Sequence, residues 1–88
     1  MRNEMSDLIR ETMKEMRSYE LNVHHLQEMT KDLNFLKQDH KKVYERLLMK
    51  NRIEIEENEF KVQECCMIID AFIKSKNFID DNVEIFYL

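Results

Sequence analysis

The chain of 88 residues contains neither glycine nor proline, although average usage would place about ten such residues in a chain of this length. Glycine supplies the positive φ angles of tight turns and helix C-caps, and proline ends helices. Their absence argues against a compact fold with many turns and favours long, uninterrupted helices. A chain this short forms at most one small domain.

A heptad pattern runs through the centre of the chain. Apolar or semi-apolar side chains recur at alternating steps of three and four, with mostly charged or polar residues between them: Leu26, Met29, Leu33, Leu36, His40, Val43 and Leu47. This is the a/d pattern of a coiled coil, whose narrow apolar stripe must lie against another helix. A similar stripe precedes it: Met5, Ile9, Thr12, Met16, Tyr19, Val23 and Leu26. We therefore predict one long coiled-coil helix in residues 1–50, covering roughly 3–50.

The two stripes join out of phase. Val23, Leu26 and Met29 are separated by two successive steps of three. Such a stammer is a local phase slip in the contact face of a coiled coil. With no helix-breaking residue nearby, the helix is expected to continue through it.

A second loss of phase follows Leu47, because the next in-phase position is Glu54 whereas the apolar residue is Ile55. Three interpretations of residues 51–59 remain open. Alternation of apolar and charged residues over 52–62 fits a short β-hairpin, and asparagine at position 51 would suit a helix–helix corner. A continuing helix is favoured, because a tight hairpin turn at residues 57–58 would lack the glycine it prefers.

Residues 60–88 are predicted to form an apolar helical segment followed by a docked tail ending in Ile85–Leu88. A helix is expected over roughly 54–76. Apolar side chains between Phe60 and Ile73 cover more than half of its circumference, which is more than a two-stranded seam can bury. We predict this region as the main contact surface, with contact residues Val62, Cys65, Ile69, Phe72 and Ile73 in addition to those of the central stripe.

The remaining motifs favour packing over chemistry. Adjacent Cys65 and Cys66 diverge by about 100° on a helix, so they should not pair with each other and are expected to pack as small apolar residues. Glu20, His24 and Glu28 share a face that could hold zinc weakly with help from a second chain, but an exposed polar face is favoured. His40, at a seam position, is expected to fix the register. We expect no cofactor, no metal and no catalytic site.

The charge distribution limits the choice of partners. The net charge is −4, with ten basic against nine acidic residues in 1–50 and four against nine in 51–88. A nucleic-acid binder usually needs a basic face, and the basic residues between Lys37 and Lys50 are interrupted by acidic ones. The longest apolar run is far too short for a membrane span, and the charged N-terminus does not resemble a signal peptide. An intracellular location, cytoplasmic or nuclear, is expected.

Together these features predict an all-α, elongated, self-associating coiled coil or long helical hairpin. The expected function is structural: an oligomerisation module that mediates protein–protein assembly, with a second copy or a helical protein as partner. No small-molecule substrate, nucleic acid or membrane is expected, and the chain is not predicted to be an enzyme. The alternative is a small acidic helical inhibitor or adaptor that binds a basic site on another protein.

Overall fold

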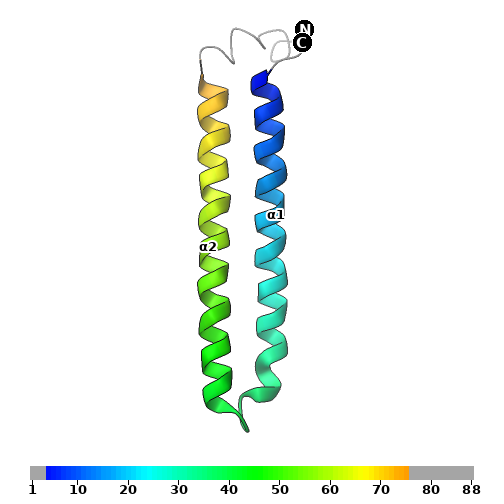
Figure 1. The fold of residues 1–88 in the computed structure, drawn as a ribbon, viewed down its shortest axis with the longest axis vertical. Coiled ribbons are helices and arrows are strands. Elements are labelled where there is room, and N and C mark those ends of the chain that lie inside the picture. Colours follow the sequence, from blue (N-terminus) through cyan, green and yellow to red (C-terminus); the bar gives the residue numbers. More distant parts are fainter. Residues whose placement is uncertain (1–3, 76–88) are drawn as a thin grey trace.

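A computed structural model describes residues 4–75 and shows two long antiparallel helices joined at one end (Figure 1). Helix α1 spans Glu4–Asp32, a short 3-10 helix η1 spans Leu33–Leu36, and helix α2 spans Lys41–Lys74. The molecule measures 62 × 18 × 17 Å. The prediction of an all-α, elongated fold is confirmed, and the architecture is a helical hairpin.

The predicted continuous helix over residues 3–50 is wrong, because the chain reverses direction between α1 and α2. Residues 33–40 lie in the middle of the stretch with the most regular heptads. The reversal uses a 3-10 turn, and the His40 N–H donates to the Leu36 carbonyl at 2.9 Å. No residue from 4 to 75 has a positive φ angle, so this turn needs no glycine. Folding back lets the apolar stripe of α1 be covered by the same chain.

His40 does not occupy a seam position. It is exposed in the connection, at the N-cap position of α2, and its carbonyl accepts the Tyr44 N–H at 2.9 Å. The predicted role of its side chain in fixing the helix register is therefore wrong.

Helix α2 is continuous through the segment whose structure the sequence left open. Residues 51–62 are helical throughout, so the β-hairpin and the corner near Asn51 are excluded and the helical interpretation is confirmed. The predicted tail contact of Ile85–Leu88 lies outside the described residues.

The seam between α1 and α2 keeps one unbroken heptad phase. The side chains least exposed along it recur at alternating steps of three and four: Met5, Ile9, Thr12, Met16, Tyr19, Val23, Leu26 and Thr30 in α1, and Tyr44, Leu48, Asn51, Ile55, Asn58, Val62, Cys65, Ile69 and Phe72 in α2. Thr30 takes the place expected for Met29, which is 53% exposed. Both predicted phase slips are therefore absent.

Two hydrogen bonds that involve side-chain amides join α1 to α2 among the described residues. Asn51 is only 7% exposed, and its Nδ2 donates to Thr30 Oγ1 at a long 3.4 Å. The Thr30 hydroxyl itself donates to the Leu26 carbonyl at 2.8 Å. Asn22 Nδ2 donates to Asn58 Oδ1 at 3.1 Å, one heptad from Asn51 along α2. Polar residues at such positions fix the register of paired helices at a cost in stability.

Candidate interaction surfaces

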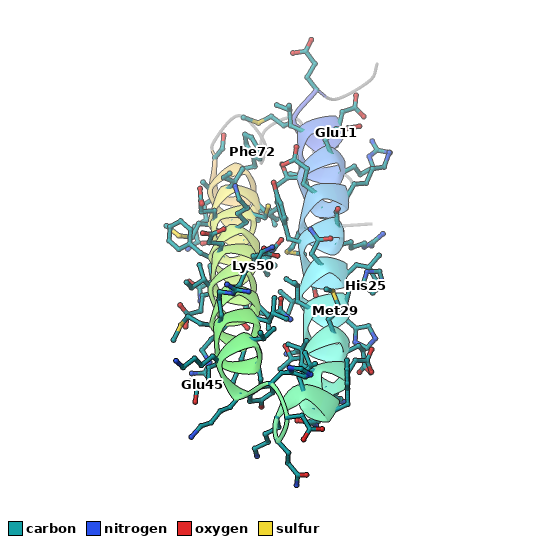
Figure 2. The ribbon with its side chains drawn as sticks, turned by 60° about the horizontal axis from the view of Figure 1, so that its bottom comes forward. Glu11, His25, Met29, Glu45, Lys50 and Phe72 are labelled. Carbon is teal, nitrogen blue, oxygen red and sulfur yellow. The ribbon has the colours of Figure 1, made fainter. Side chains whose placement is uncertain are left out.

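Five of the twelve predicted contact residues lie in the seam between α1 and α2 of the same chain: Leu26, Val62, Cys65, Ile69 and Phe72. Leu26 and Cys65 are buried, at 8% and 4% exposure. The half-buried ones are Leu33, Leu36, Leu47, Val62, Ile69 and Phe72. Met29, His40, Val43 and Ile73 are exposed. Figure 2 shows side chains projecting around both helices, among them the exposed His25 and Glu45.

The hairpin has very little core. Among residues 4–75, Leu26 and Cys65 are the only fully buried apolar side chains. Eleven large apolar side chains are exposed: Leu8, Leu21, Met29, Phe35, Val43, Met49, Ile53, Phe60, Met67, Ile68 and Ile73. Apolar surface on this scale is typical of a protein that binds another surface.

An apolar groove lies at the closed end of the hairpin. It is lined by Met29, Asp32, Leu33, Phe35, Leu47, Lys50 and Asn51. Phe35, in η1, is 76% exposed and is the most exposed large apolar side chain among the described residues. We call this the tip groove. It opens on the flank of the hairpin that carries Leu47 and Lys50.

A second groove lies near the open end and contains sulfur. Met13, Met16, Cys66, Ile69, Asp70 and Ile73 line it, and Cys66 Sγ lies 3.5 Å from Met16 Sδ. Both cysteines are free thiols; Cys65 is buried, as predicted, whereas the prediction that Cys66 also packs as a small apolar residue is wrong, because its side chain is exposed. Cys65 is buried in the seam, where desolvation, followed by the nearby charge of Glu15, raises the pKa of its thiol.

The two cysteines should therefore differ in reactivity. The thiolate is the reactive species, so the exposed Cys66 should be alkylated more than about tenfold faster than Cys65 at neutral pH. Peptide mass spectrometry after timed iodoacetamide treatment measures both rates in one sample. Denaturant should bring the two rates together, and equal rates in the folded protein would contradict the placement of Cys65 in the seam.

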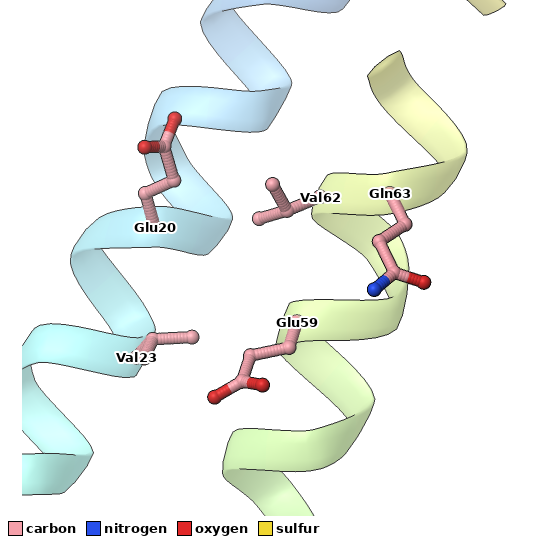
Figure 3. A pocket seen from close by; sticks show the side chains of 5 residues that line it. All are labelled: Glu20, Val23, Glu59, Val62 and Gln63. Atoms are coloured by element: carbon pink, nitrogen blue, oxygen red, sulfur yellow. The ribbon is translucent and has the colours of Figure 1, made fainter. Parts of the chain in front are cut away.

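A third groove lies halfway along the hairpin. Figure 3 shows Val23 and Val62 facing each other between the helices, with Glu20, Glu59 and Gln63 around them. The three polar residues are exposed and the valines are half-buried. The arrangement is a polar rim around an apolar helix contact.

The outer face of α2 carries an apolar stripe that the sequence analysis did not single out. Ile53, Phe60 and Met67 are 47%, 61% and 71% exposed. Glu56, Glu57 and Glu64 line a shallow groove with Ile53 and Phe60. The interval of seven between the apolar residues would have revealed this stripe in the sequence.

Within residues 4–75, no three His, Cys, Asp or Glu side chains converge on a possible metal site, so Glu20, His24 and Glu28 do not form one within a single chain. Over the same range, neither helix is long and apolar enough to cross a membrane. No family model, curated protein or solved structure matches the chain. The fold and its surfaces define an elongated helical hairpin with exposed apolar faces.

Proposed function

We propose that the protein is an architectural module that self-associates and thereby assembles protein chains. The observation that carries this proposal is the imbalance between core and surface: two fully buried apolar side chains against eleven large exposed ones among the described residues. Two helices that bury so little gain most of their stability by packing against further helices. Grooves at the closed end and near the open end offer such packing sites.

Self-association should make stability depend on concentration. A ligand or partner that binds only the folded state raises the melting temperature by mass action, and here the partner is the chain itself. The melting temperature from circular dichroism should rise across a hundredfold range of protein concentration. Sedimentation equilibrium should give a mass above the 10.9 kDa of the single chain. A monomer whose melting is independent of concentration would overturn the proposal.

The outer stripe of α2 favours a second candidate function, the acidic adaptor or inhibitor. Exposed Phe60 and Ile53 lie beside three glutamates and one lysine, Lys61. The groove is therefore acidic on balance, and its chemistry suits a basic amphipathic helix of another protein. The same mass measurement separates the two candidates. An adaptor of this kind remains monomeric alone and forms a one-to-one complex with a basic helical peptide, whereas the assembly module is oligomeric without any addition.

A further inference from the structure

One flank of α2 carries a second stripe with heptad spacing, distinct from the seam and from the outer stripe. Its members alternate at steps of four and three: Val43, Leu47, Lys50, Glu54, Glu57, Lys61, Glu64, Ile68 and Ala71. We call it the flank stripe. Leu47 and Lys50 also line the tip groove, so the stripe begins at that groove and runs toward the open end.

Two copies of the flank stripe are complementary when they lie antiparallel, because apolar residues then meet apolar residues and most charges meet opposite charges. Two apolar residues stand at each end, and the five between them are basic, acidic, acidic, basic and acidic. When the stripe is laid antiparallel on itself about Glu57, Leu47 meets Ile68, and Val43 meets Ala71. Lys50 then meets Glu64, and Glu54 meets Lys61. Only Glu57 faces its own equivalent.

A parallel pairing of the same stripe would be unfavourable. Each of the five charged residues would then face its own copy, and like charges directly opposite one another destabilise a helix pair. The antiparallel orientation reduces five like-charge contacts to one. The flank stripe therefore selects both a second copy as its occupant and the direction in which that copy lies.

Four of the five charged residues of the flank stripe are exposed and available for such contacts, and the fifth, Glu54, is half-buried. Lys50, Glu57 and Glu64 are exposed, and none of them joins the ion pairs found among the described residues. Lys61 makes a cation–π contact, with its Nζ 5.5 Å from the centre of the Tyr19 ring, and remains exposed. Ile68 is 44% exposed, so it can reach a neighbouring molecule.

We propose that α2 pairs antiparallel with α2 of a second copy through the flank stripe, so that Ile68 of each copy enters the tip groove of the other. There Met29, Leu33, Phe35 and Leu47 would surround it. The contact spans residues 43–71, about 42 Å of helix. This inference rests on the proposed self-association and specifies its surface, its orientation and its symmetry.

Two single charge reversals test the pairing. Lys50→Glu places two like-charge contacts in its own dimer, and so does Glu64→Lys. Each variant alone should weaken dimerisation by about tenfold or more. Mixed in equal amounts, the two variants form a heterodimer in which both contacts are again between opposite charges, so the mixture should recover the parent mass in sedimentation equilibrium. A parallel pair would respond differently: each single variant would keep the parent's number of like-charge contacts at positions 50 and 64, so neither variant alone would weaken the dimer.

Matched controls come from the same helix. Lys42→Glu and Glu56→Lys make the same changes in net charge at exposed positions outside the flank stripe, so each should retain the parent dimer. Equal weakening by the controls, or no recovery on mixing, would overturn the antiparallel contact. If the parent is oligomeric and neither stripe variant changes its mass, the inference fails while the proposed function stands. A parent chain that is monomeric at every concentration overturns both.

Discussion

Truncating Leu26 to alanine is expected to lower the free energy of unfolding by about 2–5 kcal/mol, the usual cost of removing a buried leucine side chain. Leu26 is one of the two apolar residues that are fully buried among residues 4–75. In the middle of α2, Asn51 and Asn58 occupy the seam positions on either side of Ile55, so this part of the seam has few other apolar side chains. Urea unfolding followed by circular dichroism measures the change.

Met29→Ala is the matched control for Leu26→Ala. The sequence assigns both residues to one apolar stripe, yet Met29 is 53% exposed, so its truncation should cost within about 0.5 kcal/mol, as for an ordinary surface residue. The Leu26 variant could already be unfolded in buffer without urea. In that case, loss of its helical circular dichroism signal while the Met29 variant remains folded would also show that truncation costs more at Leu26. Equal costs at the two positions would mean that the seam does not pass through Thr30.

The helical class and the contact face of α1 could be predicted from the sequence. An absence of glycine and proline leaves few ways to make turns, and an alternating step of three and four is specific to helices that pack together. All seven seam positions proposed from Met5 to Leu26 are half-buried or buried. These features depend on local spacing alone, which is why the sequence carries them.

The position of the reversal could not be predicted in the same way. Leu33, Leu36, Val43 and Leu47 continue the heptad spacing through the connection, and no residue there is a helix breaker. Where the helix ends is decided by the pairing of two segments far apart in the chain. That pairing needs helices of nearly equal length on either side of residues 33–40. This requirement comes from tertiary packing and cannot be deduced from the local spacing of apolar residues.

The two false phase slips have a single physical origin. The predicted stripe took the more apolar Met29 in place of Thr30 and left out Asn51, although it already included Thr12. The structure places the polar side chains of Thr30 and Asn51 against each other, where each satisfies hydrogen-bonding capacity that burial would otherwise leave unmet. When Thr30 and Asn51 are counted as seam residues, the heptad spacing continues without a phase slip through each helix.

Asn51→Asp is expected to be among the most damaging single substitutions in the hairpin. It replaces a neutral amide that is 7% exposed with a carboxylate of nearly the same shape. No basic group of α1 forms an ion pair there among the described residues. A buried charge without a partner costs about 3–5 kcal/mol. Asn51→Leu is the companion variant: it should retain or raise stability, while relaxing the register that Thr30 and Asn51 fix.

The loss in Asn51→Asp should depend on pH in a definite direction. Burial disfavours the charged form, so the pKa of the new carboxyl in the folded state lies above its unfolded value of about 3.9. The folded variant then holds its proton more tightly than the unfolded one. The loss in free energy of unfolding, relative to the parent, is therefore smallest below about pH 4. It grows as the pH rises toward the pKa of the folded state and reaches its full size above that pKa. Urea unfolding of both proteins at pH 4 and pH 7 measures this difference. A deficit that is equal at the two pH values would show that the side chain at position 51 reaches solvent, and the polar contact with Thr30 would then not lie in the seam.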